Sequence, residues 1–430
     1  MKPTMNRILT LRRAAAALSL LLLASQARAL SLHEAAEQAL QQDPRLAAAH
    51  LDASGSAADV EAARAGYRPS VNAQVLGGRS RLYTNAQFPE PGNRNPLSWG
   101  LVASQPLYNG GLVGAQVDAA QSKLAGAEQN EVATAQQLLF AASSAWLDVK
   151  RDRAVIALNA SNVERLTQAL GDSRKRLAAG EATKADVAQA ESRLAEAGAA
   201  LQRARAAEAV DAAAYERVVG VAPDALPGDW PQPRVPATLA QALAVSGDTP
   251  AVRAADAEDR AAKARIQVEQ AGHLPKLSLE AEASDADDST FTYDRQTYWS
   301  VQLKATLPIY AGGAVASRVS AARAAASAAE ARAADSRRAS NEAIAQAWAQ
   351  YQSSAQVIAA YEAAVTASEL ALDSVQREQA VGTRTTLDLL DAQRELLAAR
   401  VNLAASQHDR SLAALELLAA TGRLSLAAIP

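Results

Sequence analysis

The sequence QPLYNGG at residues 105–111 returns 202 positions later as LPIYAGG at residues 307–313. Residues of uncommon type continue to recur at this offset without a gap over the 115 residues from Pro106 to Gly220. Chance does not keep rare residues in one register over such a distance. The pattern indicates an internal duplication in which each copy is one structural unit. The recurring pairs are Trp146 and Trp348, Gly180 and Gly382, Asp186 and Asp388, and Gly220 and Gly422.

Residues 1–29 have the features of a secretory signal. Lys2, Arg7 and two further arginines precede an apolar run over 14–24, and Ala27-Arg28-Ala29 fits the small-x-small rule for cleavage. The apolar run is too short to span a bilayer as an anchor. Cleavage would remove five positive charges and no acid, which changes the net charge from −3 to about −8. This mildly acidic balance argues against nucleic acid as a partner.

The composition limits the class of protein further. The chain has no cysteine, so an exported protein of this length is held together without disulfides and has no lipid-anchored cysteine. After residue 29 no run reaches about 18 consecutive apolar residues, which excludes a helical membrane protein.

Proline marks where long helices are expected. Proline is absent between Pro106 and Pro223 and again between Pro308 and Pro430, and both windows are rich in Ala, Leu, Glu, Gln and Arg. Each window is interrupted once, at a glycine followed by a Thr-x-x-Asp sequence that resembles a capping box. Each window therefore predicts a hairpin of one helix of about 70 residues and one of about 38, the longer roughly 105 Å in length. Shorter helices are expected at 44–65 and 250–271.

A different pattern lies between the short and the long helices. Apolar and polar residues alternate over 277–284 and 299–307, and less regularly over 71–75 and 99–103, which predicts strands. Loops are expected at 88–96 and 285–296. Ten of the 17 aromatic residues lie within 67–108 and 291–310, as expected for aromatic girdles at a bilayer interface. The alternative is a soluble β-hairpin packed on helices.

The duplication and the proline pattern divide the chain. The joining segment has five prolines within residues 223–236, which makes it a stiff linker. The expected divisions are a signal peptide (1–29), a first repeat (30–222, with a β-hairpin at 70–107 and a helical turn at 180–183), an equatorial linker (223–237), a second repeat (238–422, with a β-hairpin at 276–308 and a turn at 382–385) and a tail (423–430).

Four strands are too few to close a barrel, and open strand edges cannot face lipid. Strands placed in a membrane must then be pooled from several chains. Three chains supply twelve strands, which is within the range of known membrane barrels. Two chains supply eight, and side chains fill the interior of an eight-stranded barrel.

The sequence GTRTTLDLLDA at 382–392 resembles the periplasmic turn of the TolC-type outer-membrane efflux proteins. The two strand-end motifs at 105–111 and 307–313 resemble that family as well, and the resemblance covers essentially the whole chain after residue 29. It implies a mainly α protein with a membrane β part: a homotrimer with a 12-stranded β-barrel continuous with a periplasmic 12-helix α-barrel. It also implies a passive conduit in the outer membrane of a Gram-negative bacterium. Its partners would be an inner-membrane transporter and a periplasmic adaptor, in tripartite efflux or type I secretion.

The resemblance also implies roles for residues at the two turns. Asp388 and Asp391 would line the closed entrance as rings of carboxylates that bind cations. Arg384 and Asp186 would hold neighbouring helices shut, and the turns at Gly180 and Gly382 would receive the adaptor. Independently of the family, Asp388 is in position to cap a helix, and both glycines are in position for left-handed C-caps. Trp146 and Trp348 are expected to be packing residues.

Two positions depart from the family pattern. Gln379 stands where well-known members have tyrosine, and Ala185 where a hydroxyl partner for the arginine is common. The closed state is accordingly expected to be weaker or differently connected.

The sequence carries no sign of an enzyme. Its four histidines are scattered without metal-ligand spacing, no Gly-rich phosphate loop follows a strand, and no cofactor is expected. The second functional hypothesis is a periplasmic adaptor or scaffold with long α-hairpins, although adaptors carry a single hairpin. A purely structural coiled-coil protein does not account for the alternating strands. The exported cargo cannot be read from the sequence.

Overall fold

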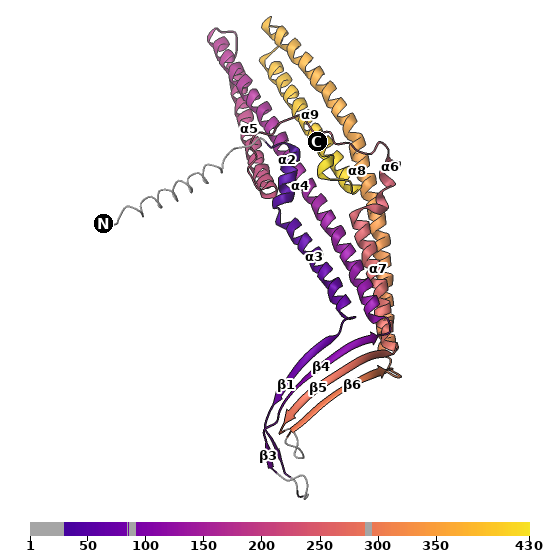
Figure 1. Ribbon diagram of the computed structural model, residues 1–430. Coiled ribbons are helices and arrows are strands. Elements are labelled where there is room, and N and C mark those ends of the chain that lie inside the picture. Colours follow the sequence, from indigo (N-terminus) through magenta and orange to yellow (C-terminus); the bar gives the residue numbers. More distant parts are fainter. Residues whose placement is uncertain (1–29, 84, 86–91, 289–294) are drawn as a thin grey trace, which may run out of the picture. The chain divides into compact units, whose positions relative to one another are not determined.

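The computed structural model describes residues 30–83, 85, 92–288 and 295–430 (Figure 1). The expected signal peptide at 1–29 lies outside the described residues, as do parts of the expected loops at 88–96 and 285–296. The chain forms two compact units, each of which takes segments from both halves of the sequence. Of the described residues, the first comprises 30–44, Ala135–Val245 and Ala343–Pro430, and the second comprises those within Arg45–Thr134 and Ser246–Glu342.

The proline-free windows form two helical hairpins, as predicted. Helix α4 (Leu112–Ala178) has 67 residues and is followed by α5 (Lys184–Val219) with 36. Helix α8 (Ala314–Ala380) also has 67 residues and is followed by α9 (Thr386–Ala420) with 35. The first hairpin is α4 with α5, and the second is α8 with α9. Strong helix formers without a proline let both long helices run unbroken.

Each hairpin turns through the same local structure. Gly180 and Gly382 adopt φ values of +77° and +81°, in the left-handed region that favours glycine. In both turns the amide after the glycine donates to a carbonyl five residues back, as in a Schellman motif. Capping boxes then start α5 at Thr183 and α9 at Thr385. The predicted C-caps and capping boxes are therefore confirmed.

Replacing Gly180 by alanine is expected to destabilise the first hairpin by about 1 kcal/mol, because a Cβ disfavours the left-handed conformation. No atom lies within 4 Å of the added Cβ, so the cost comes from the backbone alone. Gly171→Ala is the matched control: that site is equally open but lies inside α4, so the same change should stabilise by about 0.5–1 kcal/mol. Thermal unfolding followed by circular dichroism measures both, and a gain in stability at Gly180 would contradict the assignment of the turn.

The strands form one antiparallel sheet of four in the second unit, in the order β1-β4-β5-β6 (Figure 1). Their bounds are Ser70–Gly77, Leu97–Tyr108, Lys276–Asp287 and Arg295–Thr306. The last two strands extend into both ends of the segment expected to be a loop, because Asp285 to Asp287 pair with Thr297 to Arg295. A small second sheet of β2 (Ser80–Leu82) and β3 (Gly92–Arg94) was not predicted.

Shorter helices complete the fold. They are α2 (Leu32–Gln42), α3 (Pro44–Ala65), α6 (Leu239–Leu243) and α7 (Pro250–Gln270), with 3-10 turns η1 (Ser246–Asp248), η2 (Ala271–His273) and η3 (Leu426–Ala428).

The core of the first unit confirms the packing role predicted for the two repeated tryptophans. Trp146 is 1% exposed, and its indole nitrogen donates to the Leu30 carbonyl at 3.1 Å. Trp348 packs against a buried cluster that contains Ile344 and Leu417.

Candidate functional site

The register of the four-stranded sheet places apolar side chains of every strand on one face. Val71 of β1 lies opposite Ala103 of β4, which lies opposite Ala281 of β5, which lies opposite Val301 of β6. Residues directly opposite one another share a face. The neighbouring row of the same face consists of Ala73, Leu101, Ala283 and Trp299.

This apolar face is exposed within the chain. Val71, Val301 and Trp299 are 67%, 62% and 77% exposed. The other face is polar, with Lys304 3.2 Å from Glu280. A soluble sheet buries its apolar face, so a large exposed apolar patch marks a contact with lipid or protein. The edge strands β1 and β6 also each have one side unpaired in this sheet.

The two repeat aspartates cap helices at the turns. The Thr385 amide donates to Asp388 Oδ2 at 2.9 Å, and the Asp388 amide donates to Thr385 Oγ1 at 3.2 Å. Asp186 makes the same contacts with Thr183. Backbone and side-chain hydrogen bonds from the threonine lower the pKa of each carboxyl below its usual value. Both carboxyl groups are therefore ionised at neutral pH, and helix capping accounts for all of these contacts within one chain.

The other two charged residues predicted at the turns have different partners. Arg384 Nε donates to Glu378 Oε2 at 2.8 Å. This hydrogen bond and the negative charge of Glu378 raise the pKa of the guanidinium. Asp391 accepts a hydrogen bond from Arg193 at 3.0 Å. Arg193 lies on α5 and Asp391 on α9, so this pair joins the first hairpin to the second.

Arg193 was not identified from the sequence. Its position in the duplication offered a signal, because the residue 202 positions later is Glu395, of opposite charge. An apolar cluster also joins α5 and α9 beside this charged pair. Leu390 packs with Leu166 of α4 and Ala197 of α5, and Val163, Ala169 and Leu194 surround them.

A cavity of about 580 Å³ lies between the two turns. The charged residues that line it, Asp172, Arg176 and Glu181, all come from the first hairpin. The second hairpin contributes Gln379 and Gly382. Gln379, one of the two departures from the family pattern, donates to Thr386 Oγ1 at 3.5 Å and so bridges α8 to α9. The other departure, Ala185, is exposed at the start of α5.

Among residues 30–83, 85, 92–288 and 295–430 no cluster of His, Asp or Glu side chains is arranged to hold a metal ion. A separate search of these residues finds no helix with the length and hydropathy needed to cross a membrane.

Comparison with known proteins decides the family. The family model for outer membrane efflux proteins matches residues 35–221 and 241–423. The chain belongs to the outer membrane efflux protein family. Among relatives within this family, outer membrane efflux protein BepC of Brucella suis is 31% identical over 370 residues, which cover 85% of this chain and 80% of BepC. Proteases secretion protein PrtF of Dickeya chrysanthemi is 25% identical over 415 residues, which cover 91% and 88% of the two chains.

The fold also resembles solved members of the outer membrane efflux protein family. The crystal structure of outer membrane protein VceC from Vibrio cholerae superposes with a TM-score of 0.79 at 22% identity, covering 91% of this chain and 96% of VceC. The mainly α class with an added sheet is thus confirmed. The protein is an outer-membrane efflux or secretion channel, which supports the channel hypothesis over the adaptor hypothesis. Its family is one of transport proteins.

Proposed function

We propose that three copies of this chain form one export duct through the outer membrane. Each copy contributes four strands to a 12-stranded barrel, and its two hairpins contribute four helical strands to a 12-helix barrel in the periplasm. The exposed apolar sheet face, bordered by two unpaired edges, carries this proposal. In hydrocarbon an unpaired edge costs several kcal/mol per group, and joining three sheets edge to edge removes every edge. The apolar face then meets lipid and the polar face lines the lumen.

The proposed duct uses the duplicated chain as two similar building blocks. Residues 30–222 and 238–422 each supply two membrane strands and one long hairpin. The segment 223–237 joins them, and 423–430 forms the tail. Because each trimer contains six such blocks, its wall has sixfold pseudosymmetry.

The duct is a passive conduit that serves an inner-membrane transporter through a periplasmic adaptor. We place the adaptor contact at the turns of Gly180 and Gly382. The cavity between these turns supports this placement, because it offers a recess with charged walls. The cargo is small molecules or polypeptides, since BepC is named for efflux and PrtF for protease secretion.

At the entrance, Asp388 and Asp391 are proposed to form rings of carboxylates around the axis, with Arg384 and Asp186 in the latch between helices. Asp391 differs from Asp388 in one respect that matters for cation binding. Its charge is paired directly with Arg193 of the same chain, whereas Asp388 accepts hydrogen bonds from neutral donors and the nearby Arg384 is paired with Glu378. We therefore assign the stronger cation affinity to the Asp388 ring.

Membrane fractionation followed by electrophoresis without boiling tests the proposal. The protein should be found in the outer-membrane fraction as a band of about three times the mass of the boiled chain, because closed membrane barrels resist detergent. A soluble monomer in the periplasmic fraction would contradict the duct. Co-purification with an adaptor and a transporter tests the partners separately.

A further inference from the structure

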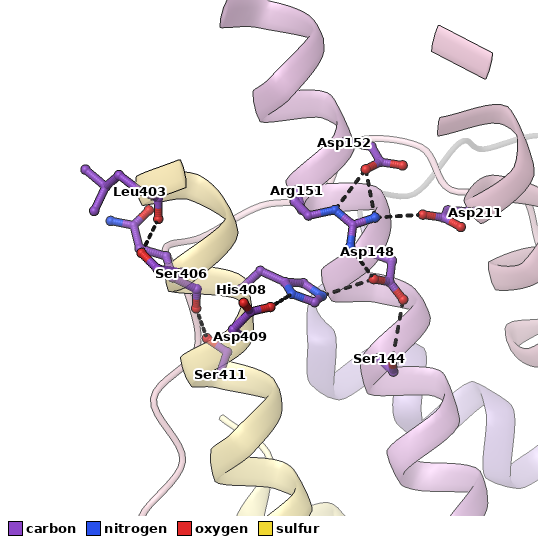
Figure 2. Close-up of polar contacts among 11 residues, drawn as sticks. Ser144, Asp148, Arg151, Asp152, Asp211, Leu403, Ser406, His408, Asp409 and Ser411 are labelled. Carbon is purple, nitrogen blue, oxygen red and sulfur yellow. Dashed lines mark hydrogen bonds and ion pairs between the residues drawn. The ribbon is translucent and has the colours of Figure 1, made fainter. Parts of the chain in front are cut away.

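A charged cluster in the first compact unit lies between the two hairpins (Figure 2). Asp148, Arg151 and Asp152 come from α4 of the first hairpin, and His408 comes from α9 of the second. Arg151 donates to Asp148, Asp152 and Asp211 at 2.9–3.0 Å. Nothing in the proposed transport mechanism uses this cluster.

The surroundings of His408 require a positive charge on its ring. The side chain is 5% exposed, with Nδ1 2.9 Å from Asp409 Oδ1 and Nε2 3.0 Å from Asp148 Oδ1. A neutral imidazole donates from only one nitrogen, and the lone pair of the other would face a carboxylate. The Nε2 contact is not aligned as a hydrogen bond, so attraction across it depends on charge. Only the imidazolium form satisfies both contacts.

Charges on all the packed elements favour this proton on balance. Burial lowers the pKa of His408, but its contacts with Asp148 and Asp409 and the charge of Asp148 raise it by more, and the charge of Arg151 lowers it slightly. Burial raises the pKa of Asp148, and the contacts with His408 and Arg151 lower it by more. The charged residues of the elements packed around the cluster are Asp148, Lys150, Arg151 and Asp152 of α4, Asp211 of α5, Asp229 of the linker, and Asp409 and Arg410 of α9.

The linker between the two repeats is fixed at the same place. Trp230 meets the His408 ring edge to face, with ring centroids 6.5 Å apart. Ser411 of α9 donates to the Pro231 carbonyl at 2.9 Å, and Arg153 of α4 donates to the Pro223 carbonyl at 2.7 Å. The cluster thus connects both hairpins and the segment that joins them.

We propose that His408 is a positioning residue whose protonated ring ties the second hairpin to the first at Asp148, and that loss of its proton loosens this tie. The proposal goes beyond the export function and does not depend on the number of chains in the duct. Because its folded-state pKa is raised, the tie is complete below the ordinary histidine pKa of about 6.5 and is lost as the pH rises through the raised value. At the acid end it persists until Asp148 is protonated, below the usual carboxyl range.

The absence of cysteine makes the distance between the hairpins directly measurable. Spin labels are placed on the exposed positions Ala157→Cys of α4 and Asn402→Cys of α9, in full-length protein diluted with unlabelled chain. Pulsed electron resonance should give a narrow distance distribution at about pH 6 and a broader one at about pH 9. The distance distribution of the His408→Gln variant should be broad at both pH values. The distribution of the His408→Lys variant, which keeps a positive charge at this position, should be narrow at both pH values.

His50→Gln is the matched control. His50 Nδ1 also lies 3.0 Å from a carboxylate, that of Glu131, but its side chain is 71% exposed, and the variant should behave as the parent protein does. The chain has only four histidines, so nuclear magnetic resonance of the ring carbons can follow the titration of His408 without spin labels. A pKa at or below about 6.5, or a distribution that is the same at both pH values, would overturn the proposal even where the lysine variant fails to fold.

Discussion

Val301→Arg is expected to destabilise the membrane sheet by about 2–4 kcal/mol, the cost of an arginine near the middle of the lipid-facing surface of a barrel. Val301 lies near the middle of β6 on the apolar face, opposite Ala281, and is 62% exposed within the chain. In the proposed trimer the change occurs three times, so the expected loss of assembled protein is large. The measurement is the amount of unboiled trimer in the outer-membrane fraction, together with urea unfolding in phospholipid vesicles.

Gln302→Arg is the matched control for Val301→Arg. Gln302 is the next residue of the same strand and lies opposite Glu280 on the polar face, where an added cation meets a carboxylate and water. It should assemble as the parent protein does. If Gln302→Arg were the damaging change and Val301→Arg the tolerated one, the polar face would be the one in contact with lipid. Equal tolerance of both would show that neither face meets lipid.

The long helices and the long strands of this fold were predictable because each has a local signal. Proline-free windows identified the long helices, Thr183 and Thr385 identified their restarts, and alternation around Val301 identified the strands. These signals depend on neighbours in sequence, and the structure confirms them. The small sheet of β2 and β3 was missed because each strand has only three residues, too few to establish a period.

The contacts between the hairpins were not predictable from local pattern. Arg193 and Asp391 are 198 residues apart, and His408 and Asp148 are 260 apart. Each was visible in the sequence only as one more charge on a polar helix face. The turn residues show the converse. The local sequence predicted Asp186 and Asp388 as helix caps, which their contacts confirm, and only the family resemblance gave them a role at the entrance. A role in gating therefore depends on neighbouring chains.

Arg193→Asp is expected to open the entrance of the duct. The pair with Asp391 joins the two hairpins at one of the proposed carboxylate rings, and reversing one charge replaces attraction by repulsion between α5 and α9. An exposed pair of this kind contributes about 0.2–1 kcal/mol. With about 1 kcal/mol lost in each of three chains, the open fraction would rise by up to about two orders of magnitude. Single-channel conductance in planar bilayers measures this as a much larger closed-state current, with Arg384→Ala as a parallel test of the latch implied by the family.

Two further variants show whether the link between hairpins is the cause. Arg174→Asp reverses a similar charge near the same turn, but Arg174 pairs with Glu191 at 2.7 Å inside the first hairpin, so the entrance should stay closed. The charge swap Arg193→Asp with Asp391→Arg restores attraction across the same contact and should restore the small closed-state conductance. If Arg174→Asp opened the duct equally, the effect would come from the net charge of the entrance as a whole. If the swap, which restores that net charge, failed to close the duct, the contact between Arg193 and Asp391 would not be what holds the entrance shut. If Arg174→Asp leaves the duct closed and the swap closes it again, attraction between α5 and α9 holds the entrance shut. These two helices must then separate when the duct opens.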